Sequence, residues 1–414
     1  MQGSKVRRMN SKTSIPARTT VTLDTVNGDL EIGKHVTVKG TGSPSTVKVA
    51  GTVYCEGHNT FECNLSAHEL NAENSVTVHG DLEIEEDVEV EDGRLEVYGK
   101  MTAGDVDVDD AVYVSKDLSA DEVEVGGSLR VDGNTKVETI DVGGSFEAKG
   151  EVTADDVEVG GRLSIDSKVD IKNLDVGGTA TVAGGSIRDI DVGGTFESEG
   201  PLEFEEVDVG GTVELAGKGK GGEIEVGGFL RADDGLEFEK IEAGGKVEIR
   251  GLAQGEDMEV GGTVDVDGSL KLTGTIEVGG RVDVSGEITA RNIEIGGALR
   301  ARKATAEERV EVGGSINTGE GVTARFVEIG NRGQVQGPIR ADEIVVGKNA
   351  EVENLYGKSI VLRSGATANN IYGGNMVIES HCRIDGEVQY TNELRQGDQV
   401  SFAQTPKRVD TLPV

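Results

Sequence analysis

Apolar and polar residues alternate along most of this chain in short runs that return about every 17 residues. Within one period, the apolar positions fall in residues 146–148, 152–154 and 157–159, and each run places two side chains on the same side of an extended segment. Gly150 and the pair Gly160-Gly161 separate these runs, and glycine supplies the positive or unrestricted φ that a tight corner requires. One period therefore predicts three short strands joined by corners.

The repeat is best followed through the first glycine after each V-x-V unit. This glycine stands at Gly126, Gly143, Gly160, Gly177, Gly193, Gly210, Gly227, Gly244, Gly261, Gly279, Gly296, Gly313, Gly330 and Gly347, a mean spacing of 17 residues. Helical repeats need roughly 30 to 45 residues for a helix pair, so this period excludes them. We therefore predict an all-β fold, a single-stranded parallel β-helix in the form of a triangular β-solenoid with about 17 residues per coil. The rule for parallel crossovers predicts that it is right-handed.

Two inward apolar columns begin at Val123 and Val125 and end at Ile344 and Val346, and an acidic column runs between them. Its members are Glu124, Asp141, Glu158, Asp175, Asp191, Asp208, Glu225, Glu242, Glu259, Glu277, Glu294, Glu311 and Glu328. Like charges repel at the roughly 4.8 Å spacing of stacked strands. We interpret this column as a solvated face, and the alternative is that it binds divalent cations or a basic partner.

The regularity of the repeat divides the chain. We expect a basic flexible tail over residues 1–20, less regular solenoid coils over 21–120, the regular repeat over 121–347, C-terminal coils over 348–403 and a C-terminal tail over 404–414. Terminal coils lack one neighbour and expose unpaired backbone groups, which favours pairing with another molecule. The alternative is that the two tails fold across the ends and leave a monomer. The residues predicted to make the end contacts are Leu30, Ile32, Val400 and Phe402.

Charge and composition exclude several classes of partner. The net charge of −35 makes binding of nucleic acid by the body of the protein unfavourable, and it either maintains solubility or reflects a salty cytoplasm. Three cysteines are too few for a secreted disulfide scaffold, and no apolar run is long enough to span a bilayer. We therefore expect a cytoplasmic protein.

The first 20 residues are basic and hold no acid. Their cations are Lys5, Arg7, Arg8, Lys12 and Arg18. Such a segment could contact anionic lipid, which would associate the protein with a membrane, or the acidic face of another molecule. A solvated tail without a partner is the alternative.

Candidate chemistry is sparse. Cys55, His58, Cys63 and His68 are spaced C-x2-H-x4-C-x4-H, which is similar to a zinc knuckle, but alternation along strands directs some of these residues into the core. The sequence contains no HExxH, no P-loop and no Ser-His-Asp order. We expect no enzyme activity, no cofactor and no metal. The alternative is a β-helix enzyme, or a rod that binds carbohydrate or a surface.

The stacked xVxVGG strands and the closing stretch GEVQYTNELRQGDQVSFAQTPKRVDTLP resemble the bactofilins, and the closing stretch is similar to the tail of long archaeal members. The resemblance implies a right-handed triangular β-helix that polymerises end to end without nucleotide and serves as a cytoskeletal scaffold, often at a membrane. Two features differ from that family: this chain is much longer, and it shows no short apolar N-terminal segment for membrane targeting.

Overall fold

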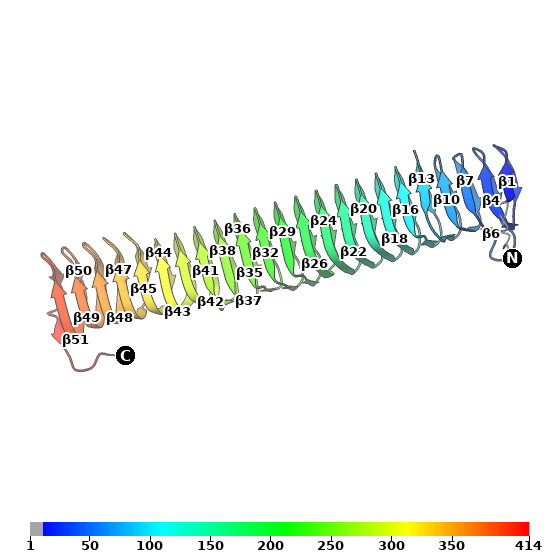
Figure 1. Ribbon diagram of the computed structural model, residues 1–414. Coiled ribbons are helices and arrows are strands. Elements are labelled where there is room, and N and C mark those ends of the chain that lie inside the picture. Colours follow the sequence, from blue (N-terminus) through cyan, green and yellow to red (C-terminus); the bar gives the residue numbers. More distant parts are fainter. Residues whose placement is uncertain (1–10, 414) are drawn as a thin grey trace, which may run out of the picture. The chain divides into compact units, whose positions relative to one another are not determined.

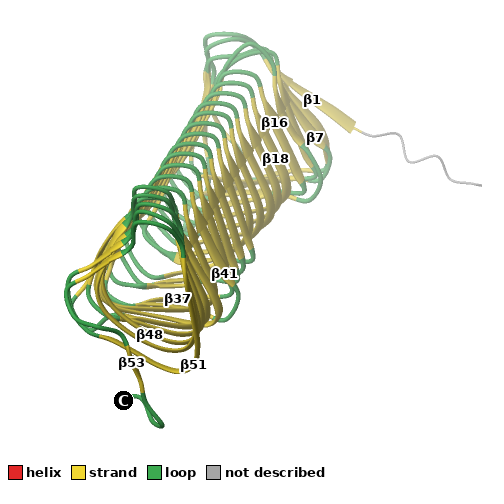
Figure 2. Cartoon of the chain, turned by 90° about the vertical axis from the view of Figure 1, so that its left-hand side faces the viewer, coloured by secondary structure: helices red, strands yellow, loops and turns green. Residues whose placement is uncertain are grey.

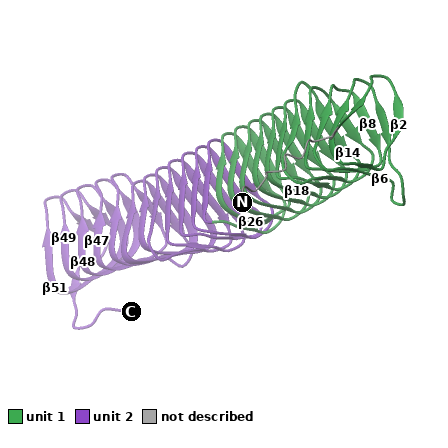
Figure 3. Cartoon of the chain, turned by 45° about the vertical axis from the view of Figure 1, so that its right-hand side comes forward, with its two compact units in different colours: residues 1–204 green, residues 205–414 purple. Residues whose placement is uncertain are grey.

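The computed structural model describes residues 11–413, and the chain divides into two compact units, Met1–Phe204 and Glu205–Val414 (Figure 3). Among the described residues both units consist of strands and turns, and neither contains a helix. Accordingly, no helix within residues 11–413 has the length and hydropathy needed to cross a membrane.

The strands of the first unit are short, mostly three to five residues, with five longer ones of eight residues. They are β1 (Ser11–Ile15), β2 (Thr20–Thr22), β3 (Thr25–Val26), β4 (Gly28–Ile32), β5 (Thr37–Lys39), β6 (Thr46–Val49), β7 (Thr52–Cys55), β8 (Asn59–Glu62), β9 (Asn64–Ala67), β10 (Glu69–Ala72), β11 (Val76–Val78), β12 (Leu82–Ile84), β13 (Val88–Val90), β14 (Arg94–Val97), β15 (Met101–Thr102), β16 (Asp105–Val108), β17 (Ala111–Val114), β18 (Leu118–Val125), β19 (Ser128–Val131), β20 (Thr135–Val142), β21 (Ser145–Ala148), β22 (Val152–Val159), β23 (Arg162–Ile165), β24 (Val169–Val176), β25 (Thr179–Val182), β26 (Gly185–Val192), β27 (Thr195–Ser198) and β28 (Leu202–Glu203).

The second unit begins with similar short strands and continues with longer ones that pass around corners. They are β29 (Glu206–Val209), β30 (Thr212–Leu215), β31 (Gly219–Lys220), β32 (Glu223–Val226), β33 (Phe229–Ala232), β34 (Leu236–Glu237), β35 (Lys240–Ala243), β36 (Lys246–Arg250), β37 (Ala253–Gly255), β38 (Asp257–Val260), β39 (Thr263–Asp267), β40 (Leu270–Leu272), β41 (Thr275–Val278), β42 (Arg281–Ile295), β43 (Ala298–Val312), β44 (Ser315–Thr318), β45 (Val322–Ile329), β46 (Gln334–Gln336), β47 (Ile339–Val346), β48 (Glu351–Leu362), β49 (Thr367–Ile378), β50 (Arg383–Ile384), β51 (Val388–Gln396), β52 (Ser401–Phe402) and β53 (Lys407–Arg408).

Within each unit the strands stack in parallel, one coil on the next (Figure 1). In the early coils each strand pairs with the third strand after it, so that β4, β7, β10 and β13 form one column while β5, β8, β11 and β14 form another. Three columns arise in this way, and the loops gather in rows at the corners between them (Figure 2). Partners lie about 17 residues apart, as in Val142↔Val159, which confirms the predicted parallel β-solenoid.

The core is a thin stack of aliphatic side chains. Every member of the two inward columns from Val123 to Ile344 and from Val125 to Val346 is buried, which confirms the predicted alternation. Val157 and Val159 lie at 2% and 0% exposure, while Glu158 between them is exposed. Because the inward residues of successive coils contact one another directly, the spacing of the repeat sets the register of the core.

The Gly-Gly pairs serve a different purpose from the one predicted. Neither Gly160 nor Gly161 has a left-handed φ, so conformational freedom is not what requires glycine there. A Cβ on Gly160 would lie 2.3 Å from the carbonyl oxygen of Gly143 in the preceding coil, and a Cβ on Gly161 would lie 2.5 Å from that of Gly144. The glycine column is therefore imposed by close backbone stacking between coils. Close stacking also explains the glycine in the turn at Gly150, since a Cβ added there would lie 2.2 Å from the carbonyl oxygen of Gly133.

The solenoid extends further toward both termini than the sequence predicts. Residues 11–20 are not a flexible tail, because β1 pairs in parallel with β4 from Ser11↔Gly28 to Ile15↔Ile32. At the other end β53 pairs with β51, so the structure continues past residue 403. Both strands are poor in apolar residues, and their pairing depends on backbone hydrogen bonds that hydropathy does not reveal. The predicted contacts of Lys5, Arg7 and Arg8 lie outside the described residues.

Candidate functional site

The first coil has strand edges that are paired on one side. Among residues 11–413, β1, β2 and β3 each pair only with a strand of the following coil, β4, β5 and β6 respectively. Ile15, Val21 and Leu23 point toward the core and are half-buried, because no described coil covers them from the other side. The first coil therefore presents both backbone groups and apolar side chains for a further β-structure.

Leu30 and Ile32 do not belong to this end, and that prediction is wrong. Both lie in β4, which is covered by β1 on one side and by β7 on the other. Their exposure is 0% and 1%. The error follows from the position of β1: its sequence, SKTSI, contains one apolar residue, so the strand that covers them could not be recognised from its pattern.

The last coil resembles the first. Phe402 in β52 pairs with Ile384 of β50, and Val400 precedes it; both predicted contact residues are half-buried on this terminal coil. Leu394 in β51 stacks over Met376 and is also half-buried, although the sequence did not indicate it. The repeat spacing that would have placed Leu394 in this column is broken by a register shift between Gly373 and Asn375 in β49.

Strand β53 pairs with the first part of β51 only. Its two residues pair with Gln389 and Tyr390 of β51, and Tyr390 O accepts a hydrogen bond from Val409 N at 2.9 Å. Residues 393–396 of β51 pair with β49 but with no other strand among residues 11–413. The C-terminal segment therefore leaves most of the edge of β51 available.

The predicted acidic column is real in both units. In the first unit Glu124, Asp141, Glu158, Asp175 and Asp191 pair in sequence, and the column extends backward through Asp107 and Glu89, two members that the repeat pattern did not reveal. In the second unit the column runs from Asp208 to Glu328. These carboxylates point outward in stacked rows, so each one inside a row faces like charges above and below.

Beyond Glu328 the same outward column becomes apolar. Glu328 is followed by Val345, Val361 and Val377, and then by Arg395 on β51. Val377 is 40% exposed. On a neighbouring column of these coils Tyr356 and Tyr372 stack with their ring centroids 5.1 Å apart. The last coils of the second unit thus have a surface chemistry distinct from the acidic coils before them.

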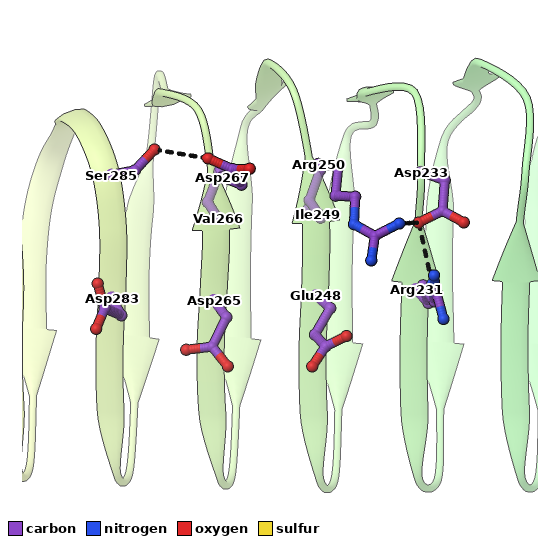
Figure 4. A pocket seen from close by; sticks show the side chains of 10 residues that line it. All are labelled: Arg231, Asp233, Glu248, Ile249, Arg250, Asp265, Val266, Asp267, Asp283 and Ser285. Carbon is purple, nitrogen blue, oxygen red and sulfur yellow. Dashed lines mark hydrogen bonds and ion pairs between the residues drawn. The ribbon is translucent and has the colours of Figure 1, made fainter.

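A shallow hollow of about 320 Å³ lies over β33, β36, β39 and β42 (Figure 4). Its lining carries five carboxylates and two guanidinium groups, and consists of Arg231, Asp233, Glu248, Ile249, Arg250, Asp265, Val266, Asp267, Asp283 and Ser285. Asp233 Oδ1 accepts from Arg231 Nε and from Arg250 Nη1, each at 3.0 Å. The only hydroxyl in this lining, on Ser285, donates to Asp267 Oδ1 at 3.2 Å. The hollow contains neither His nor Cys, and its lining presents mainly surface charges that pair with one another.

The residues of the zinc-knuckle spacing are not brought together. Cys55 and Cys63 point into the core, where burial raises the pKa of their thiols to about 12 and about 11. His58 stacks against His35 with centroids 5.1 Å apart. Among residues 11–413, the one cluster of three or more potential metal ligands combines His68 with Glu69 and Glu86, and it includes neither cysteine.

Comparison with known proteins gave no match. No protein-family model matches the chain, and neither a curated protein nor a solved structure is detectably similar to it. The resemblance to bactofilins therefore stays a prediction from the repeat motif and from the closing stretch of the sequence.

Proposed function

We propose that this protein is a structural scaffold, without enzyme activity, that assembles end to end into filaments that need no nucleotide. The observation that carries the proposal is the state of the two terminal coils. Within the described residues 11–413, each has strand edges with a partner on one side only and inward apolar side chains that are half-buried, among them Ile15 at one end and Phe402 at the other. If another copy continues the stack, the backbone groups of these edges gain hydrogen-bond partners and the apolar side chains become buried.

Such a contact is head-to-tail. The first coil adds β1, β2 and β3 to the three columns, and β51, β52 and β53 add to the same three columns in the same order at the other end. A second copy that adds its first coil to the last coil of its neighbour extends parallel pairing without a dedicated motif. A heterologous contact of this kind does not close on itself, so it generates a filament.

The surface charge favours this mode over side-to-side association. Acidic columns run along both units, and the net charge is −35, so lateral contact would bring like charges together. The resemblance to bactofilins supports the same function, and it suggests a cytoplasmic location.

The test is electron microscopy and analytical sedimentation of the purified full chain in a buffer without nucleotide. Wild-type protein is expected to form filaments. Phe402→Lys places a charge on the half-buried apolar surface of the last coil, so this variant is expected to sediment as a monomer. Ser401→Lys is the matched control, since Ser401 is exposed on the same strand.

Circular dichroism is used to check that both variants retain their strands. Because the substitution touches only the final coil, the remaining coils should be unaffected. Strictly monomeric wild-type protein at high concentration would refute the proposal. Filaments of Phe402→Lys indistinguishable from those of Ser401→Lys would show that this coil is not the contact.

A further inference from the structure

Four ligand-bearing side chains meet at one corner of two successive coils in the first unit. His68 lies between β9 and β10, and Glu69 is the first residue of β10. Glu85 and Glu86 occupy the equivalent corner of the next coil, between β12 and β13, where Glu86 N donates to His68 O at 2.9 Å. One ligand atom each from His68, Glu69 and Glu86 lie within 4.8 Å of one another.

The imidazole has a carboxylate oxygen at each of its nitrogens. His68 Nδ1 lies 3.2 Å from Glu85 Oε2, and Nε2 lies 3.5 Å from Glu86 Oε2. His68 Nδ1 is within hydrogen-bonding distance of Glu85. Nε2 and Glu86 Oε2 face each other at a separation longer than an ordinary hydrogen bond, and a cation between these two atoms would be bound by both.

The separation fits a metal ion. Two ligands at about 2.0–2.1 Å from a tetrahedral zinc ion are roughly 3.3 Å apart, close to the 3.5 Å between Nε2 and Glu86 Oε2. A carboxylate that accepts from the other imidazole nitrogen is the usual outer partner of a metal-bound histidine, and Glu85 is in that place. We propose that His68 Nε2, Glu86 and Glu69 bind a divalent transition-metal ion such as Zn²⁺, with Glu85 orienting the imidazole.

The surroundings favour a cation. Among the ion pairs within residues 11–413, Glu85 and Glu86 pair only with His68, and Glu69 pairs with no Lys or Arg, so three carboxylates face one imidazole. Thr52 Oγ1 donates to Glu69 Oε2 at 2.9 Å and holds that side chain in place. The side chains of His68 and Glu86 are 38% and 56% exposed, which leaves room for water to complete the coordination. An imidazole nitrogen among the ligands favours Zn²⁺ over Mg²⁺ or Ca²⁺, which take oxygen ligands.

The ion would add a further link between two coils that already share backbone hydrogen bonds, core contacts and the contact of His68 with Glu85 at this corner. Metal binding should therefore raise the melting temperature of the first unit. This inference is independent of filament assembly, because the corner lies on the side of the coils and not at a terminal edge.

The experiment is calorimetric titration of chelator-treated, full-length protein with ZnCl2 in excess Mg²⁺, which competes with Zn²⁺ for any nonspecific binding to the acidic columns. One saturable equivalent is expected, with a parallel Co²⁺ absorption band that reports nitrogen and oxygen ligation. His68→Gln and Glu86→Gln should each weaken this binding at least tenfold. The matched controls are His79→Gln and Glu83→Gln, which make the same chemical changes nearby and should bind as the wild type does.

The outcomes separate the explanations. Equal Zn²⁺ binding by wild-type protein and both site variants would mean that the acidic surface alone binds the ion, and it would overturn the proposal. Absence of a saturable equivalent would overturn it as well. If His68→Gln loses its strands by circular dichroism, the binding measured for Glu86→Gln, which alters an exposed side chain, decides between these outcomes.

Discussion

A single methyl group on the glycine column should separate two coils. Gly160→Ala places its Cβ 2.3 Å from the Gly143 oxygen, about 1 Å inside ordinary contact, and the obstacle is backbone that cannot rotate away. Gly319→Ala is the matched control: its Cβ would lie 3.9 Å from the nearest atom, and Gly319, like Gly160, has no left-handed φ. Both substitutions reduce the freedom of the unfolded chain equally, so their difference isolates the contact.

The magnitude follows from the hydrogen bonds at this corner. Gly160 N donates to Val142 O at 2.9 Å, and Arg162 N donates to Gly144 O at 3.1 Å. Opening the stack by about 1 Å would take both beyond bonding distance, at about 0.5–1.5 kcal/mol net for each. Gly160→Ala should therefore be less stable than Gly319→Ala by about 1–3 kcal/mol, whereas the control should equal or exceed the wild type.

Native-state hydrogen exchange measures this effect where it occurs, because repeat proteins open locally. Protection of the amides at Gly160, Arg162 and Gly177 should fall roughly 5- to 150-fold in Gly160→Ala, since each 1.4 kcal/mol is a factor of ten. Amides several coils away should keep their protection. Unchanged exchange at these three amides would refute the explanation that close stacking requires glycine here.

Two further predictions concern charge and protonation. Glu158→Gln removes repulsion of about 0.9 kcal/mol in water from each of Asp141 and Asp175, so it should stabilise the protein by about 1–2 kcal/mol at low salt and much less in 1 M NaCl; an equal gain at both salts in thermal melts would contradict the electrostatic explanation. Burial raises the pKa of Cys55 to about 12 and that of Cys63 to about 11, so the fold favours the protonated thiols: this contribution is complete below the ordinary thiol pKa and is lost as the pH rises through 11 to 12. Alkaline unfolding should therefore shift to higher pH in Cys55→Ala with Cys63→Ala, and thiol reagents at pH 8 should react with the wild type only after unfolding; rapid reaction of the native protein would show that these cysteines are accessible.

The inward or outward direction of side chains in the regular repeat was predictable because the same apolar–polar alternation recurs in every coil. Val157 and Val159 point inward and Glu158 outward for the same reason as their equivalents 17 residues away, so a single period determines the core, the acidic column and the parallel pairing. The prediction failed where the pattern weakens. In SKTSI at the start and in β53 (Lys407–Arg408) near the end, backbone pairing continues with few apolar residues, and the ends were therefore placed too far inward.

The sequence alone determined that this chain is a parallel β-solenoid, because burial of an alternating pattern with a constant period has few other solutions. Only the tertiary structure decided which residues form the terminal coils, why glycine occupies the corners, and which side chains of different coils meet. His68 and Glu86 are 18 positions apart in the sequence, and Gly143 and Gly160 are 17 apart; each pair comes together only through stacking. Contacts of this kind depend on the distance between successive coils and on the backbone conformation of each corner. Neither can be predicted from the hydropathy pattern of a single strand.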